Sequence, residues 1–255
     1  MKPLLEVRDV CLSYHTVLGE TPALSHISFD LMPDEFLAIV GPSGCGKTTL
    51  LNLIAGLSLP EHGTILMDDS PVALQKSRIG YMLQKDHLLE WRSIYRNVIL
   101  GLEIRNQLTT QNLSTVDQML KAYELDKFRD AKPSQLSGGM RQRAALIRTL
   151  APDPDLLLLD EPFSALDYQT RLRVCDDIGR LLKKAAKPAI LVTHDISEAI
   201  SMADRIIILG NRPASIQRII PIRLDIPDRT PLSSRSAPDF KYYFNLIWKE
   251  LNQNV

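Results

Sequence analysis

The sequence predicts an α/β protein with a mostly parallel sheet core, an antiparallel β lobe and a helical subdomain. Short continuous apolar runs such as EFLAIV and DLLLLDEP alternate with helical patterns, which is typical of buried parallel strands. The N-terminal segment LLEVRDVCLSY alternates apolar and polar residues and indicates an antiparallel strand. Between residues 86 and 150 the strand patterns stop, and apolar residues recur at helical spacings. These observations favour a sheet core with a helical insertion.

The elements before the insertion follow in a simple order. Two antiparallel strands come first, separated by a turn-like segment. A buried strand then runs from Glu35 into Gly41, and a helix, a turn with an edge strand and a second buried strand follow it. The stretches are LLEVRDVCLSY, the turn-like LGETPAL, HISFDLM, EFLAIV, KTTLLNLIAGL, PEHGTILMDD and RIGYMLQ.

After the insertion, the strands resume at DLLLLDEP, AILVTHD and RIIILG, each preceded by a helical stretch. From Asn211 the chain is rich in proline, and we expect it to be extended up to a short final helix. Residues 1–85 and 151–210 should form the core with its β lobe, residues 86–150 the helical subdomain and residues 211–255 the tail. The tail residues Phe240, Phe244, Ile247 and Leu251 share one helical face, which we expect to dock on the core rather than in a partner's groove.

Composition narrows the class of protein. The 255 residues include 30 basic and 30 acidic side chains, so no overall charge attracts the chain to nucleic acid or to an anionic membrane. Cys11, Cys45 and Cys175 are far apart and in no CxxC pair, which favours a reducing compartment over a metal site. The N-terminus does not resemble a signal peptide, and no apolar run approaches the roughly 20 residues that span a bilayer. We therefore expect a cytosolic chain.

The segment GPSGCGKT, residues 41–48, matches the phosphate-loop pattern G-x-x-x-x-G-K-[ST] between a predicted strand and a predicted helix. Its glycines let backbone N–H groups surround the β-phosphate of a nucleotide, while Lys47 reaches the β- and γ-phosphates and Thr48 binds Mg²⁺. This context disfavours the alternative of a plain glycine-rich turn. The expected nucleotide-binding residues of the loop are Gly41, Pro42, Ser43, Gly44, Cys45, Gly46, Lys47, Thr48 and Thr49.

The segment LLLLDEP, residues 156–162, supplies two carboxylates after a buried strand. Asp160 is placed to hold Mg²⁺. Glu161 is placed to act as the general base for the water that attacks the γ-phosphate. The alternative, two solvated acids at a strand end, loses weight beside the phosphate loop. The core is therefore expected to bind and hydrolyse a nucleotide.

The segment LSGGMRQR, residues 136–143, begins a helix with a Ser-Gly-Gly turn, which suits an anion. With the two preceding motifs, the sequence resembles the ATP-binding subunits of ATP-binding cassette (ABC) transporters. The resemblance implies that Ser137, Gly138 and Gly139 hold the γ-phosphate of ATP bound to a partner protomer. It also implies a head-to-tail dimer, of identical or paired ATPase chains, with ATP and Mg²⁺ in its interface.

The same resemblance assigns further residues. Tyr14 looks like the aromatic residue that stacks on adenine, although a strand-packing tyrosine is the alternative. Gln84 looks like the glutamine that contacts Mg²⁺ and the attacking water. SALD, residues 164–167, looks like the loop that crosses between protomers and brings Asp167 to the nucleotide. His194 looks like the switch histidine near the γ-phosphate, because it follows a strand that ends at the expected ligand edge of the sheet.

Three stretches resemble the importers for nitrate, sulfonate and taurine-type anions: LQKDHLLEWRSIYRNVILGLEIR, DEPFSALD and RSAPDFKYYFNLIWKEL. Glu90 stands where that branch has proline before Trp91, on the surface expected to receive a separate permease. The implied protein is peripheral on the cytoplasmic face of the membrane, with permease subunits and, indirectly, a solute-binding protein as partners. Three alternatives stay open: the ATPase of an exporter, an ABC ATPase acting on DNA or ribosomes, and a non-catalytic binding module. Neutral charge argues against nucleic acid.

Overall fold

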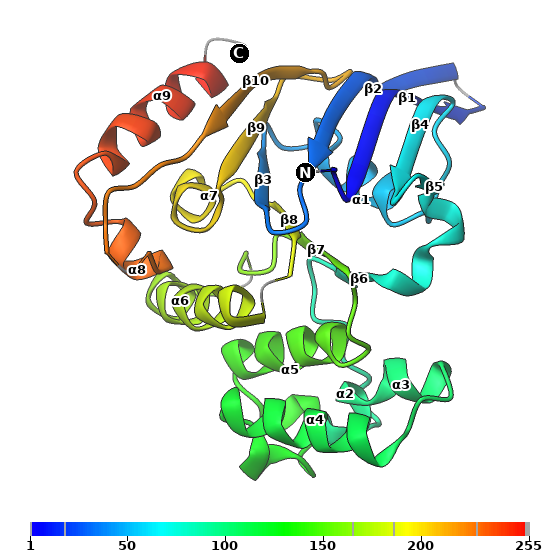
Figure 1. Cartoon of the computed structure of the whole chain (residues 1–255), viewed down its shortest axis with the longest axis vertical. Helices are drawn as coiled ribbons and strands as arrows, with labels where there is room; N and C mark the ends of the chain where they lie inside the picture. Colours follow the sequence, from blue (N-terminus) through cyan, green and yellow to red (C-terminus); the bar gives the residue numbers. More distant parts are fainter. Residues whose placement is uncertain (1, 18, 165, 186, 228, 253–255) are drawn as a thin grey trace.

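The computed structural model describes residues 2–17, 19–164, 166–185, 187–227 and 229–252. Figure 1 shows a central sheet with helices on one side, an antiparallel lobe on the other, and a group of helices below. The central sheet has six strands in the order β10-β9-β3-β8-β7-β6, and the lobe has four in the order β2-β1-β4-β5. The predicted fold class is confirmed.

The central sheet is parallel except at one edge. Its parallel strands are β3 (Phe36–Val40), β6 (Ile79–Met82), β7 (Leu156–Asp160), β8 (Ala189–Val192) and β9 (Arg205–Leu209). Every residue of β7 and β8 is buried, as strands covered on both faces should be. In β7, Leu157 and Leu159 face one core and Leu156 and Leu158 face the other. The sheet therefore separates two hydrophobic cores.

The antiparallel lobe consists of β1 (Leu5–Thr16), β2 (Gly19–Leu31), β4 (His62–Met67) and the two-residue β5 (Ser70–Pro71). The expected turn at residues 18–24 is wrong, because β2 already begins at Gly19 and pairs with β1 from Thr16 onward. Bulges between Val7 and Ser13 shift the register, which hides this long pairing from a simple alternation pattern. Helix α1 (Lys47–Ile54) shares the core of the lobe.

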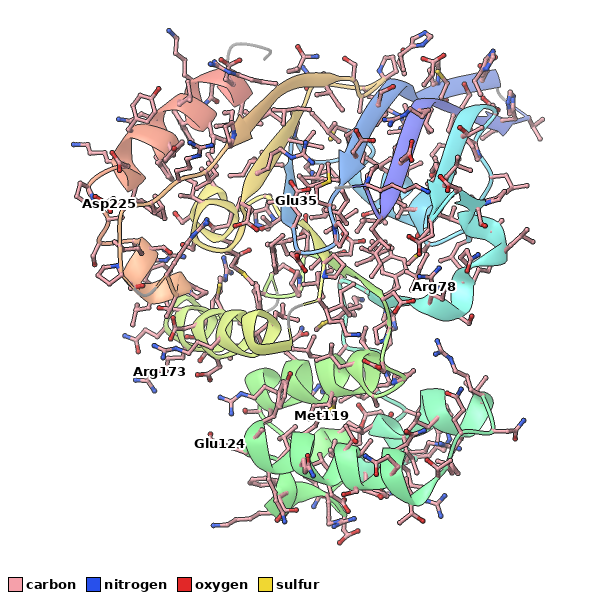
Figure 2. All side chains as sticks on the ribbon, in the orientation of Figure 1. Glu35, Arg78, Met119, Glu124, Arg173 and Asp225 are labelled. Atoms are coloured by element: carbon pink, nitrogen blue, oxygen red, sulfur yellow. The ribbon has the colours of Figure 1, made fainter. Side chains whose placement is uncertain are left out.

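Charged side chains join the lobe to the central sheet, and two of them, Glu35 and Arg78, are labelled in Figure 2. Arg205 of β9 donates to the Glu35 carboxylate, just before β3, at 2.7 and 3.0 Å, and also to the carbonyl of Asp30 in β2 of the lobe at 2.5 Å. Arg78, just before β6, pairs with Asp155 at 2.5 Å and with Asp68 of the lobe at 2.6 Å. These half-buried contacts hold the first strands of the sheet in place relative to the lobe.

The insertion is helical, as predicted. It contains α2 (Ile94–Val98), α3 (Leu100–Ile104), α4 (Thr110–Ala122) and α5 (Gly138–Leu150). Helices α6 (Tyr168–Ala185) and α7 (Ile196–Met202) cover the face of the central sheet opposite the lobe (Figure 1). The short 3₁₀ helices are Val72–Leu74, Lys76–Arg78, Asp126–Phe128 and Pro133–Gln135.

The tail is more structured than expected. Residues Ile216–Pro221 form β10, which pairs antiparallel with β9 and forms the edge of the sheet. Two helices follow, α8 (Pro231–Ser234) and α9 (Phe240–Asn252). Ile247 is fully buried, and Phe240, Phe244 and Leu251 pack against the same core. The apolar face of α9 thus docks on this chain's own core.

Candidate functional site

The largest concentration of predicted site residues surrounds a cavity of about 650 Å³. The cavity lies at the carboxyl ends of β3, β6, β7 and β8, the edge at which open α/β sheets bind ligands. Its lining residues are Tyr14, Ser43, Gly44, Gly46, Lys47, Thr48, Thr49, Gln84, Glu161, His194 and Arg212. Ten of these eleven were predicted from the sequence; Arg212 was not.

The phosphate loop is shaped by its glycines. Gly44 and Gly46 have φ values of 73° and 124°, in the left-handed region that favours glycine. A Cβ on Gly41 would lie 3.0 Å from the sulfur of Cys45 and 3.1 Å from Leu209, so the close approach also requires glycine. The loop leads directly into α1, whose N-terminal residue Gly46 provides no side-chain cap. Backbone N–H groups at this helix start therefore point to where an anion would be stabilised.

Two residues of the loop turn away from solvent. Lys47 is buried, and its Nζ donates to the carbonyl oxygens of Gly41 at 2.9 Å and Pro42 at 2.8 Å. Cys45 points into the core of the lobe, and burial raises the pKa of its thiol. Of the two, Lys47 lines the cavity.

The two predicted carboxylates have different environments. Asp160, at the end of β7, is 3% exposed, and its Oδ2 accepts a hydrogen bond from the Tyr81 hydroxyl at 3.5 Å. Burial, and then repulsion from Glu161, raise the pKa of Asp160. Among the described residues, no three His, Cys, Asp or Glu side chains form a metal cluster. A buried carboxylate beside the hydroxyl-bearing Thr48 nevertheless suits a hard divalent cation, whose remaining ligands would come from a phosphate and the Gln84 amide.

Glu161 connects the other two predicted catalytic residues. Its Oε2 accepts a hydrogen bond from Gln84 Nε2 at 3.1 Å and lies 3.2 Å from His194 Nδ1. Its φ of 44° is unusual for a residue other than glycine and costs roughly 1–3 kcal/mol, a strain found often at functional sites. Its N–H donates to Val192 O at 2.8 Å and so secures this conformation. Glu161, Gln84 and His194 thus meet although they follow three different strands.

The other end of the cavity is formed by Tyr14 and Arg212. Tyr14, on β1, is 44% exposed, and its hydroxyl hydrogen-bonds Thr49 Oγ1 at 2.9 Å. The guanidinium carbon of Arg212 lies 5.7 Å from the centre of the Tyr14 ring. No sequence motif marks Arg212, because its position depends on how the β9–β10 loop folds back on the lobe.

Eight predicted residues are not part of the cavity's lining. Gly41, Pro42, Cys45 and Asp160 belong to the phosphate loop and β7, which adjoin the cavity, whereas Ser137, Gly138, Gly139 and Asp167 lie on other segments. Ser137 is exposed and caps α5 by accepting a hydrogen bond from Met140 N at 3.4 Å. Asp167 accepts one from Thr170 N at 3.1 Å, which lowers the pKa of its carboxyl group. Ala165, in the SALD segment, lies outside the described residues. Ser137, Gly138 and Asp167 are exposed to solvent, whereas Gly139 is buried against α6.

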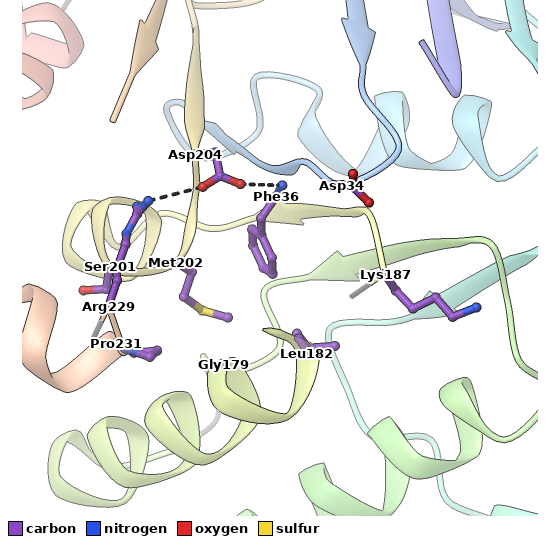
Figure 3. Close-up of a pocket in the computed structure, with 10 residues that line it drawn as sticks. All are labelled: Asp34, Phe36, Gly179, Leu182, Lys187, Ser201, Met202, Asp204, Arg229 and Pro231. Atoms are coloured by element: carbon purple, nitrogen blue, oxygen red, sulfur yellow. Dashed lines mark hydrogen bonds and ion pairs between the residues drawn. The ribbon is translucent and has the colours of Figure 1, made fainter. Parts of the chain in front are cut away.

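A second cavity, of about 330 Å³, lies at the opposite end of β3 (Figure 3). It is bordered by α6, α7 and the tail, and none of the predicted site residues lines it. Its principal charges satisfy one another, since Asp204 accepts from Phe36 N at 2.9 Å and from Arg229 at 3.2 Å. Convergent polar groups of the kind that bind a nucleotide are thus found in the first cavity.

The sequence and the structure were compared with those of known proteins. Residues 24–164 match the ABC transporter family. The chain is 46% identical to an uncharacterized ABC transporter ATP-binding protein, YtlC of Bacillus subtilis, over 97% of this chain and 95% of that one. It is 40% identical to the taurine import ATP-binding protein TauB of Pseudomonas putida, over 84% and 80%.

A solved structure also resembles this one. It is the dimeric cassette MJ0796 in a post-hydrolysis state bound to ADP and phosphate, with a TM-score of 0.75 and 30% identity over 86% of this chain and 99% of that one. These similarities, together with the cavity, define a class of protein. The chain belongs to the ABC transporter family and is an ATP-binding subunit whose ATP hydrolysis is coupled to transport.

The histidine segment contains a buried acid that sequence analysis did not single out. Glu198 of α7 is 3% exposed and accepts a hydrogen bond from Thr193 Oγ1 at 2.6 Å. Asp195 caps the same helix by accepting from the Ser197 and Glu198 N–H groups at 2.8 and 3.2 Å. Burial is the main cause that raises the pKa of Glu198, to about 7. The protonation of Glu198 is thus linked to the segment that carries His194.

We predict that Glu198→Gln reduces the dependence of stability on pH. Because folding raises the pKa of Glu198 from 4.5 to about 7, the folded state retains the proton and loses stability as pH rises through this interval. Glutamine stays neutral and still accepts the Thr193 hydrogen bond. Urea unfolding at pH 5 and pH 8 should show that the free energy of unfolding falls less between these pH values for Glu198→Gln than for wild type. Glu90→Gln, at an exposed position, is the control. Equal losses in all three proteins would contradict the assignment.

Proposed function

We propose that this subunit powers the import of a small solute of the nitrate, sulfonate or taurine type. The observation that carries the proposal is the 40% identity to TauB, a taurine import protein, over 84% of the chain. The segment that follows Gln84 and the tail, which resemble that importer branch, support it. The ATPase itself does not bind the transported solute, so the class of solute is inferred through this relationship.

We infer that the working enzyme is a head-to-tail dimer with ATP between the protomers. The phosphate loop of one protomer holds the triphosphate, and Ser137, Gly138 and Gly139 of the other complete the site. Support comes from the exposure of the Ser137 cap, from the place of these residues outside the cavity lining and from the dimeric form of the related cassette MJ0796. A helix N-terminus of this kind stabilises anions.

The chemistry assigned to the cavity is hydrolysis of the γ-phosphate. Lys47 binds the phosphate oxygens, and Tyr14 stacks on the adenine ring. Glu161 accepts the proton of the attacking water, while Gln84 and His194, both in contact with the Glu161 carboxylate, hold it in position. Mg²⁺, held by Thr48, Asp160 and Gln84, would neutralise charge on the phosphates. In the dimer, the loop that contains Asp167 crosses the interface and brings this residue to the nucleotide.

The segment after Gln84 provides a surface suited to a permease. Trp91 is 72% exposed, yet its loop is firmly held. The fully buried Asn97 accepts from Leu89 N at 2.7 Å and donates to the carbonyls of Leu89, Arg92 and Ser93. Lys132 Nζ donates to Trp91 O at 2.7 Å. A firmly held loop with an exposed aromatic residue is a suitable docking element.

The permease would hold the chain at the cytoplasmic face of the membrane. Within the described ranges, no helix has both the length and the apolar character needed to cross a bilayer. In this proposal the partner permease supplies the membrane-spanning part, and a solute-binding protein delivers the solute to it.

We expect two substitutions to separate hydrolysis from binding. Glu161→Gln removes the base and should lower ATP turnover at least about 100-fold while the Kd for ATP changes little. Lys47→Ala removes a buried charge that contacts phosphate and should weaken ATP binding at least about tenfold. Turnover and equilibrium binding by the purified proteins measure both effects. Near wild-type turnover by Glu161→Gln, or unchanged affinity in Lys47→Ala, would refute the corresponding role.

The importer assignment is tested by copurification from detergent-solubilised membranes, with mass spectrometry of the recovered chains. We expect a multi-helix permease, and a solute-binding protein with it. The two tryptophans offer a matched pair of variants, because Trp91 and Trp248 are 72% and 56% exposed in different parts of the molecule. Trp91→Ala should recover less permease than Trp248→Ala. Recovery of only soluble partners, DNA or ribosomes would overturn the importer assignment, and the assigned ATPase chemistry would be unaffected.

A further inference from the structure

The loop between β9 and β10 brings a residue of the tail into the nucleotide cavity. A hydrogen bond from Gly210 N to Ser215 O at 3.0 Å closes the loop. Arg212, inside it, lines the cavity together with Tyr14 and the phosphate loop. Its side chain is exposed, and its guanidinium group lies over the Tyr14 ring. A cation next to an aromatic face at the edge of a nucleotide cavity calls for a functional explanation.

The loop is anchored to strand β2. Ala214 N donates to Ala23 O at 2.9 Å, and Ser25 N donates to Ala214 O at 2.9 Å. Arg212 Nε also donates to Pro22 O at 3.2 Å. These contacts fix where the Arg212 side chain starts, at the edge of the cavity that it lines.

Tyr14 depends on the same segment of β2. In the pairing of β1 with β2, Tyr14 lies opposite Thr21 and Ser13 lies opposite Pro22. The Tyr14 hydroxyl is held from the other side by Thr49 of α1. Tyr14 and Arg212 are therefore mounted on one rigid support, next to the helix that begins the phosphate loop.

The Arg212 and Tyr14 side chains lie close to the separation that a flat ring between them would require. Elsewhere in the molecule Arg129 stacks on Tyr95 with 4.4 Å from the guanidinium carbon to the ring centre, which is a direct contact. The corresponding Arg212–Tyr14 distance is 5.7 Å. A base between two groups needs about 7 Å, which is two contacts of about 3.5 Å each. The present separation is longer than a direct stack but about 1 Å short of this value, so the exposed Arg212 side chain has to move outward by at least that much to admit a base.

We propose that Arg212 is a nucleotide-binding residue that covers the face of the purine opposite Tyr14. This rests on the proposed role of the cavity. The base is held between a π-face and a planar cation, contacts that use its faces rather than its hydrogen-bonding edges. Every purine has such faces, so the clamp accepts adenine and guanine alike. The clamp therefore does not select between the two purine nucleoside triphosphates, and ATP is the one that the family uses.

The test compares ligands with and without a base. Equilibrium binding of ATP, GTP and inorganic tripolyphosphate is measured for wild type, Arg212→Ala and Arg212→Lys. We expect Arg212→Ala to weaken ATP and GTP about 3- to 30-fold, equally for both, and to leave tripolyphosphate unchanged. Arg212→Lys keeps the charge without the planar group and should fall between wild type and Arg212→Ala. Arg218→Ala is the matched control, because Arg218 is an exposed arginine of the tail outside the cavity.

Each other outcome overturns the proposal. An equal loss for tripolyphosphate would assign Arg212 to the phosphates, and a loss for one purine alone would mean that it contacts an edge of the base. No loss for any ligand would remove it from the site. Failure of the proposed function is distinguishable, because then wild type itself would bind no nucleotide, or Lys47→Ala would bind as well as wild type. Thermal unfolding of Arg212→Ala beside Arg218→Ala confirms that both variants are folded.

Discussion

The site depends on the register of three parallel strands. Val192 of β8 lies opposite Ile39 of β3 on one side and Asp160 of β7 on the other. Beyond this level the backbone bonds continue, with Thr193 N donating to Ile39 O and Glu161 N to Val192 O. Glu161 and His194 therefore emerge at the same height as the start of the phosphate loop. A shift by one residue would turn every side chain of a strand to the other face and separate these groups.

The same register explains why buried leucines and catalytic acids adjoin in the sequence. Both faces of β7 are covered, one by the core of the lobe and one by the core of α5, α6 and α7. The strand is fixed by apolar packing up to Leu159, and polar chemistry begins at Asp160, its last residue. The strained conformation of Glu161 is supported at this boundary by its bond to Val192. Packing energy thus holds the geometry that catalysis requires.

The parts that sequence could predict are those with a local signature. The phosphate loop, the Asp160–Glu161 pair and the capped start of α5 each lie within a few consecutive residues, and buried strands show continuous apolar runs. What could not be predicted depends on long-range pairing. The start of β2 contains Pro22 and lacks a strand pattern, yet pairing with β1 makes it extended. Strand β10 and Arg212 have no motif, because β9 and β2 determine their positions.

We propose that Ser137 serves the nucleotide of a partner protomer, and the N-cap chemistry of α5 allows a direct test. Asp and Asn both cap helices as well as Ser does, but only Asp places a negative charge against a phosphate. Sedimentation velocity with ATP and Mg²⁺ would compare Ser137→Asp and Ser137→Asn, each combined with Glu161→Gln. We expect the Asn variant to dimerise and the Asp variant to remain monomeric while binding ATP equally well. Equal dimerisation of both, or weaker ATP binding by the Asp monomer, would contradict the claim.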